Sequence, residues 1–164
     1  MRELMKLFKT VLTILIITGF ALACAGCTVK IENLTQNKTL PTTDRVTVGN
    51  TTVYAEAAYT PAEWEMGLMN RTYLNEDAGM LFIFPIQLQQ TVWMKNMRIP
   101  LDIVFITADN HVLEIYASVP PCTTEPCALY TSSAPIKYVL EVNSGFCARH
   151  GIARGDPVII AAGS

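Results

Sequence analysis

Histidine and basic residues are scarce in this sequence. The 164 residues include only two histidines, and 12 Lys and Arg are outnumbered by 14 Asp and Glu, which gives a net charge of −2. A chain without a basic surplus lacks the electrostatic footprint of a nucleic-acid-binding protein. His111 falls in a predicted turn and His150 at the end of a short helical pattern, so neither a Ser-His-Asp nor a Cys-His group can be assembled convincingly.

Phosphate-binding and metal-binding motifs are missing as well. The chain has no glycine-rich loop of the kind that cradles phosphates. Its two histidines and five cysteines show no zinc-type spacing with a second pair of ligands. We therefore expect no cofactor and no metal site, and we identify no catalytic residue.

Charge is absent from one long segment near the N-terminus. Three basic residues precede it, and no charged residue occurs between Lys9 and Lys30, where an apolar run ends in small residues and Cys27. This layout is typical of a secretory signal, and the small residues before Cys27 resemble a lipoprotein box, although Cys24 stands where Leu is usual. An uncleaved anchor and an ordinary cleaved signal are the alternatives.

These observations predict the organisation of the first part of the chain. We expect residues 1–27 to be a leader of the signal or lipoprotein type, with Cys27 as the lipidation site. Residues 28–44 are polar and show no apolar period, which favours a flexible tether. The protein is then exported and anchored to the outer face of the cell membrane.

The remaining cysteines fit an oxidising location. Cys122 and Cys127 lie in the proline-rich segment PPCTTEPC. A disulfide across so short a loop stabilises the fold by roughly 2 kcal/mol in the chain-entropy model, and half of a metal site is the alternative. Cys147 stands alone in an apolar helical pattern, where a small buried hydrophobe is the simplest interpretation.

Short strands dominate the rest of the sequence. Two alternating runs around Gly49-Asn50 indicate a hairpin. Thr60, Pro61 and Glu63 then form the signature of a capped helix start. Further strands are expected at 79–84, 89–94, 101–106, 111–117, 137–142 and 155–160, with a second helix at 144–151 that Ser144 would cap. This pattern predicts one compact domain at 45–161, mostly β with short helices, built on a barrel-like antiparallel or mixed sheet.

Polar residues interrupt the apolar segment WMKNMRIPLDIVFI at 93–106. A buried carboxylate needs a donor, so Asp102 is expected to pair with Lys95, Arg98 or Arg71, or with backbone N–H groups. Glu141 poses the same question in YVLEVNSG. Three interpretations remain open for these residues: a mutually paired cluster, a polar-lined pocket for a small ligand, and acid–base catalysis. The pocket candidates are Arg71, Trp93, Lys95, Asn96, Asp102, Glu141 and Asn143.

The body of the chain resembles a known exported family, domain of unknown function 192. The segments that carry the resemblance are GLMNR at 67–71, GMLFIF at 79–84, WMKNMRIPLDIVFI at 93–106, PPC at 120–122, YVLEVNSG at 138–145 and GIARGDPV at 151–158. The resemblance implies a compact, mostly β fold with a barrel-like sheet and short helices, behind a signal or lipid anchor. It implies no substrate and no mechanism.

Two functions follow as hypotheses from these observations. The first is an extracytoplasmic, membrane-tethered accessory or ligand-binding module, whose partners are the membrane, through the N-terminal anchor, and a small molecule or an envelope protein. The second is a carboxylate-dependent, hydrolase-like enzyme of the cell envelope that uses Asp102, Glu141 and Lys95.

Overall fold

The computed structural model describes residues 43–163. Its strands are β1 (Thr43–Val48), β2 (Thr51–Ala58), β3 (Ala78–Leu88), β4 (Thr91–Trp93), β5 (Leu101–Ile106), β6 (Val112–Val119), β7 (Leu129–Thr131), β8 (Ile136–Asn143) and β9 (Val158–Ala161), and its helices are α2 (Pro61–Met66) and α3 (Phe146–His150). The leader, Cys27 and the predicted tether up to residue 42 lie outside this range. Within it, no helix has the length and apolar character needed to span a bilayer.

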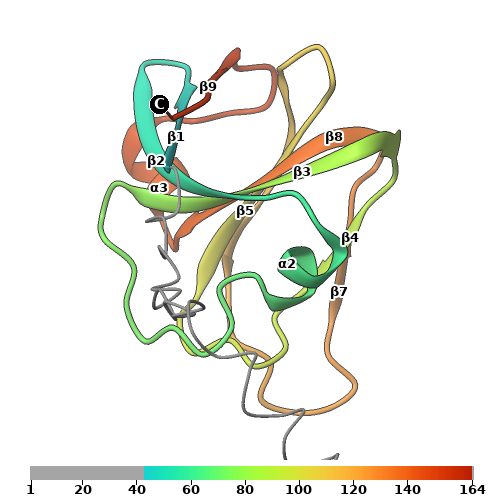
Figure 1. Cartoon of the computed structure of the whole chain (residues 1–164). Helices are drawn as coiled ribbons and strands as arrows, with labels where there is room; N and C mark the ends of the chain where they lie inside the picture. Colours follow the sequence, from blue (N-terminus) through green and yellow to red (C-terminus); the bar gives the residue numbers. More distant parts are fainter. Residues whose placement is uncertain (1–42, 164) are drawn as a thin grey trace, which may run out of the picture. The chain divides into compact units, whose positions relative to one another are not determined.

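Seven strands form one curled sheet in the order β6-β5-β8-β3-β2-β1-β9, and β4 pairs with β7 in a separate ribbon (Figure 1). All neighbouring strands are antiparallel except β2 and β3, which are parallel and are joined through α2. The two edges of the sheet meet at an isolated bridge between His111 and Pro157. This bridge explains the half-barrel shape and confirms the predicted barrel-like, mostly β fold.

Most local predictions from the sequence are confirmed. The β1–β2 hairpin turns at Gly49-Asn50. At the start of α2, the side chain of Thr60 accepts a hydrogen bond from the N–H of Glu63, and the Glu63 carboxylate accepts one from the N–H of Thr60. The predicted cap of the second helix is wrong. Gly145, not Ser144, is the N-cap of α3, and because glycine has no side chain the helix has no side-chain cap at this position.

Two apolar clusters occupy opposite faces of the sheet. Alternate residues of each strand point to opposite faces. The α3 cluster contains Val104, Ile106, Leu140 and Val142 together with Phe146 of α3. The α2 cluster contains Leu68, Met80, Phe82, Ile103 and Val139, with Trp64 of α2 packed against it. Each face therefore has its own core.

One glycine is required where β3 passes β8. A Cβ atom at Gly79 would lie 2.6 Å from the carbonyl oxygen of Glu141 and 3.0 Å from Cγ1 of Val53. Both distances are too short for any other residue without movement of the backbone. Gly79 therefore lets β8 approach β3 closely at the position that carries Glu141.

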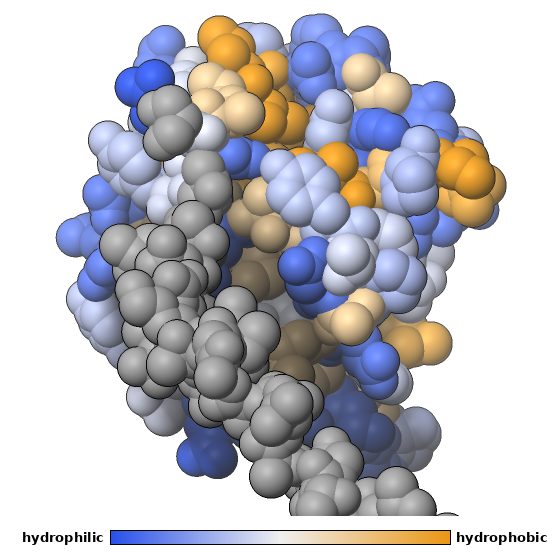
Figure 2. Space-filling view, in the orientation of Figure 1, coloured by the Kyte–Doolittle hydropathy of each residue, from blue (hydrophilic) through white to orange (hydrophobic). Residues whose placement is uncertain are grey.

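The surface of the domain is mixed. Figure 2 shows apolar residues exposed in separate patches among hydrophilic ones. The large exposed apolar side chains include Met66, Ile86, Trp93 and Leu129. Scattered exposure of single apolar side chains is normal for a folded domain.

Candidate functional site

Glu141 lies on the face of the sheet that packs against α2. On β8 it is in register with Met80 of β3 and with Ile103 of β5, both members of the α2 cluster. Its exposed fraction is only 5%. No hydrogen bond or ion pair holds its carboxyl group within residues 43–163. Burial raises the pKa of Glu141 to about 8, because removal from water penalises the charged form.

The other buried polar side chains of the described domain are all bonded. Asp44 accepts a hydrogen bond from the N–H of Gly163. Ser132 accepts one from the N–H of Gln90 and donates one to the carbonyl of Ala134. Asp102 accepts three. Buried polar groups in folded proteins are normally satisfied, so an unbonded carboxyl at Glu141 needs an explanation.

A pocket of about 310 Å³ opens beside Glu141. Its lining includes Trp64, Gly67, Phe82, Phe84, Gln90, Trp93, Lys95, Met97 and Glu141; we call it the Glu141 pocket. No completely inaccessible side-chain oxygen or nitrogen in the described domain lacks a partner. The unbonded carboxyl of Glu141 therefore keeps a small accessible area, and that area faces the pocket.

Aromatic rings form the walls of this pocket. Trp64 of α2 is fixed from both sides: its Nε1 donates a 2.9 Å hydrogen bond to the carbonyl of Ala58, and its ring lies 5.1 Å from that of Phe84. Gly67 ends α2 at φ 45°, and a Cβ atom there would lie 3.3 Å from the ring of Phe82. Helix α2 and the residue that ends it thus supply one wall, and β3 supplies the other.

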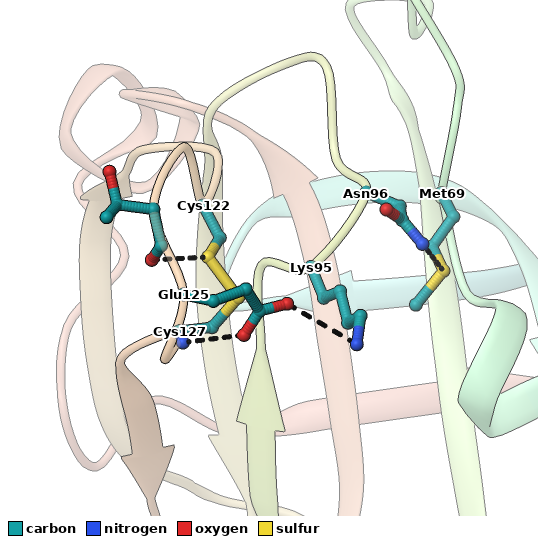
Figure 3. A network of polar contacts seen from close by, with 7 residues as sticks. Met69, Lys95, Asn96, Cys122, Glu125 and Cys127 are labelled. Carbon is teal, nitrogen blue, oxygen red and sulfur yellow. Dashed lines mark hydrogen bonds and ion pairs between the residues drawn. A yellow bond between two sulfur atoms is a disulfide. The ribbon is translucent and has the colours of Figure 1, made fainter.

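The rim of the Glu141 pocket carries a cation. The Nζ atom of Lys95 lies 5.1 Å from the centre of the Trp93 ring and 3.4 Å from a carboxylate oxygen of Glu125. Asn96 adjoins Lys95, and its Nδ2 contacts the sulfur of Met69 at 3.8 Å. Figure 3 shows the Lys95–Glu125 and Asn96–Met69 contacts together with the Cys122–Cys127 disulfide. That disulfide confirms the pairing favoured from the sequence.

A second, more open cleft of about 340 Å³ adjoins the first. It is lined by Trp93, Lys95, Asn96, Met66 and Met69, together with Ala62 and Glu65. The two cavities share part of their lining, namely Glu65, Met66, Met69, Trp93 and Lys95.

Asp102 lies on the opposite face of the sheet. Its carboxylate accepts hydrogen bonds from the backbone N–H groups of Ser118 (2.7 Å), Gly145 (2.9 Å) and Cys147 (2.9 Å). Two of these donors belong to the start of α3, so Asp102 replaces the missing side-chain cap of that helix. The expectation of a backbone partner is therefore confirmed.

The third donor to Asp102 comes from a bulge. The pairing of β5 with β6 shifts register between Leu101 and Ile103, where two residues of β6 oppose Asp102. Ser118, one of the two, adopts a positive φ of 52°. A bulged residue loses its ladder partner, and Asp102 satisfies the N–H that is set free.

The predicted mutual pairing of the polar residues in 93–102 is wrong. Arg71 forms a two-pronged ion pair with Glu56 instead, with 2.6 Å between Nη2 and Oε2. Lys95 pairs with Glu125, and Arg98 is exposed. The physical reason is the alternation of the strand, which directs Asp102 into the α3 cluster, away from the cations.

The seven sequence candidates divide into three groups. Trp93, Lys95 and Glu141 line the Glu141 pocket, and Asn96 lines the adjoining cleft. Asn143 instead donates hydrogen bonds to the carbonyls of Leu74 and Asn75, which fixes a loop. Arg71 and Asp102 are held in the contacts described above. The acid pair considered for catalysis is separated, since Asp102 is in register with Val142 and Glu141 with Ile103.

The aromatic walls were missed as site residues. The sequence predicts a strand at 79–84, which contains Phe82 and Phe84, and does not single out Trp64 as a site residue. The alternation of β3 does place Phe82 and Phe84 on one face with Met80, which is the residue in register with Glu141. Phe82 and Phe84 can be assigned to the same site as Glu141 only when the register between β3 and β8 is known.

The Cys147 thiol is also buried, but on the face that holds Asp102. It is 3% exposed and unpaired. Burial and the neighbouring Asp102 carboxylate raise the pKa of this thiol to about 12. A thiol that stays protonated is a poor nucleophile, so the interpretation of Cys147 as a buried hydrophobe is confirmed.

Comparison with known proteins places the chain in a family. The sequence profile of domain of unknown function 192, described as "Uncharacterized ACR", matches residues 44–160. No curated protein matches. A protein of unknown function from Novosphingobium aromaticivorans is 38% identical, with 70% of this chain and 83% of that chain covered and a TM-score of 0.66. A "putative transcription regulator" from Sinorhizobium meliloti is 35% identical over 71% of this chain and 92% of its own, also at a TM-score of 0.66. The chain belongs to the family of domain of unknown function 192.

Proposed function

We propose that the protein is a small-molecule-binding module of the cell envelope, exported and tethered to the outer face of the membrane through Cys27. The observation that carries the binding function is Glu141, an unbonded carboxyl with 5% exposure that faces a pocket of about 310 Å³. Burial of such a group lowers the stability of the folded protein, and hydrogen bonds from a ligand would compensate this loss.

The composition of the pocket supports binding of a small molecule. Binding sites combine mostly apolar walls with a few polar groups that fix orientation. Trp64, Phe82 and Phe84 supply apolar area, and Glu141 and Lys95 supply polar groups. The volume lies at the lower end of the range of about 300–1,000 Å³ for ligand pockets, which favours a compact ligand.

Ligand screening of the full-length protein tests this function. A ligand that binds only the folded state raises the unfolding temperature. We expect hits from a chemically diverse library, and we expect Glu141→Leu to lose them. Glu76→Gln, which changes an exposed carboxylate outside the Glu141 pocket, should keep them. A library without hits, or hits that both variants retain, would refute binding at Glu141.

The tether is supported by the N-terminal sequence and agrees with the Cys122–Cys127 disulfide, since disulfides persist in oxidising compartments. Intact-mass analysis of the membrane fraction should show loss of residues 1–26 and an added lipid. Recovery of the mature protein in soluble form, or identical processing of Cys27→Ala, would contradict the anchor.

A carboxylate-dependent hydrolase is the second candidate, and one observation favours it. With a pKa of about 8, Glu141 carries a proton at neutral pH and has the protonation state of a general acid. Asp102 cannot assist from the other face, which leaves Glu65 and Lys95 as the ionisable partners in the pocket. Turnover of an ester or amide library, lost in Glu141→Gln, would establish this activity; ligand hits recovered unchanged would count against it.

A further inference from the structure

We propose that the ligand of the Glu141 pocket is a small organic ammonium ion: a protonated primary or secondary amine whose N–H groups bond to the Glu141 carboxylate and whose apolar substituent lies between aromatic rings. This inference rests on the proposed binding function and specifies its ligand class. Among the described residues, the carboxyl group of Glu141 lacks a hydrogen-bond donor and a positively charged partner. An unbonded carboxylate needs donors and a compensating positive charge, and an ammonium head supplies both.

The pocket walls suit a cation better than a neutral head group. The rings of Trp64, Phe82, Phe84 and Trp93 line the pocket, and the faces of aromatic rings attract cations. The domain already shows this interaction at the rim, where the ammonium of Lys95 lies 5.1 Å from the centre of the Trp93 ring. Aromatic cages that recognise ammonium ligands use this attraction, and here a carboxyl group lines the same pocket as the aromatic residues.

The charges around Glu141 also favour a cation. Glu65 and Lys95 are the other ionisable groups of the pocket, and Lys95 is already neutralised by Glu125 at 3.4 Å. From the sheet, Met80 and Ile103 flank Glu141 and carry no charge. Glu56, further along the sheet, is bonded to Arg71. No free cation therefore competes with the ligand for Glu141 within residues 43–163.

Binding should be linked to proton release. Burial keeps Glu141 protonated at neutral pH, since its pKa is raised to about 8. An ammonium ion pairs with the carboxylate, so the proton must leave Glu141 when the ligand binds. At pH values below the pKa of Glu141, the affinity for an ammonium ion should therefore rise with increasing pH, by up to roughly tenfold per pH unit. A neutral ligand that accepts a hydrogen bond from the protonated acid would show the opposite dependence.

A matched set of probes tests the ligand class. Phenethylammonium, 2-phenylethanol and 3-phenylpropionate share one apolar body and differ in the head group, and trimethyl(phenethyl)ammonium keeps the charge without N–H donors. Propylammonium to hexylammonium vary the body. Isothermal titration of the full-length protein at pH 6, 7 and 8, in buffers of different ionisation enthalpy, gives both affinity and proton release.

We expect the ammonium probes to bind at least about tenfold more tightly than the alcohol. The carboxylate should not bind, and the quaternary ion should bind more weakly than the primary one. Glu141→Gln should remove the preference for ammonium and the pH dependence, whereas Glu76→Gln should change neither. The pH series on the wild type needs no variant, so it decides the matter even if Glu141→Gln folds poorly.

Three results overturn the inference. Equal binding of alcohol and ammonium, or binding that weakens as the pH rises, assigns a neutral ligand and leaves the binding function intact. Absence of binding by every ammonium probe at about 10 mM removes the ligand class, while the diverse library still decides whether the pocket binds anything. A preference for ammonium that persists in Glu141→Gln places the cation elsewhere.

Discussion

Each face of the sheet buries a carboxyl group, at Asp102 and at Glu141, but only the first has hydrogen-bond partners within the described domain. Asp102, with no exposed area, accepts three backbone hydrogen bonds and holds the start of α3 against the sheet. Glu141, in the neighbouring register position, has no partner and faces a pocket. Burial alone therefore does not identify a functional carboxyl. What distinguishes the two is whether the protein itself supplies the donors.

The largest effect should come from Asp102. Asp102→Asn keeps the shape but replaces one of the two acceptor oxygens by an NH2 group. Because Oδ1 accepts from Ser118 and Gly145 and Oδ2 accepts from Cys147, at least one buried backbone N–H is then left without an acceptor. We expect a loss of about 3 kcal/mol or more in the free energy of unfolding, measured by urea denaturation. Asp77→Asn, an exposed carboxylate, serves as the control. A loss under about 0.5 kcal/mol would mean that the three hydrogen bonds contribute little.

Burial of Glu141 should destabilise the folded domain, whereas the hydrogen-bonded Asp102 stabilises it, and the effect of Glu141 should depend on pH. The pKa of Glu141 is raised from its ordinary value of 4.5 to about 8 in the folded protein. Between these values the folded state holds a proton that the unfolded chain has lost. The free energy of unfolding should therefore fall as the pH rises from roughly 5 to 8, by at most about 1.4 kcal/mol per pH unit, and level off above pH 8.

Substitution isolates that contribution. Glu141→Gln should lower the slope of stability against pH, and at pH 8 it should be more stable than the wild type, because a charged group no longer has to be buried. Denaturation series at pH 5 to 8 provide the measurement, with Glu76→Gln as the matched variant. Parallel curves for the wild type and Glu141→Gln would show that Glu141 titrates normally.

A similar but local effect is expected from the disulfide. Replacing Cys122 and Cys127 together by Ser should cost roughly 2 kcal/mol in the chain-entropy model. The loop carries Glu125, which holds Lys95 at the rim. Hydrogen exchange should therefore increase around the Glu141 pocket and stay unchanged at α3. Increased exchange at α3 would show that the two faces are coupled.

The smallest effect concerns the cap of α2. Thr60→Ala removes the side-chain acceptor of the Glu63 N–H and should cost about 1 kcal/mol. Because α2 carries Trp64, ligand affinity should fall together with stability. Thr72→Ala, an exposed threonine outside the helix, provides the comparison. Unchanged affinity in Thr60→Ala would indicate that the contacts of Trp64 with Ala58 and Phe84 position this wall without the cap.

Local features of the chain were predictable, and long-range ones were not. The hairpin at Gly49-Asn50, the capping box at Thr60 and the Cys122–Cys127 disulfide depend on neighbours a few residues apart. The alternation of β5 also places Asp102 with Val104 and Ile106 on one face. Whether Glu141 shares that face depends on the register between β5 and β8, which the sequence of either strand alone does not contain.

The same limit explains the remaining errors. Ser144 was expected to cap α3, but the cap comes from Asp102, which is distant along the chain. The strand β7 was not predicted, because its three residues show no alternating pattern and are stabilised by pairing with β4. The aromatic walls of the pocket likewise come from α2 and β3, and only the folded sheet brings them to Glu141.

The pairing of β1 with β9 has a consequence for how the domain is made. Arg45 lies opposite Ala161, so the first strand of the domain is completed by its last. While the chain is being synthesised, β1 exposes an unpaired edge until residues 158–161 emerge, and exposed edges invite pairing with other chains. Removal of residues 158–161 would leave this edge of β1 unpaired. We therefore expect a domain without β9 to aggregate more readily than the intact one.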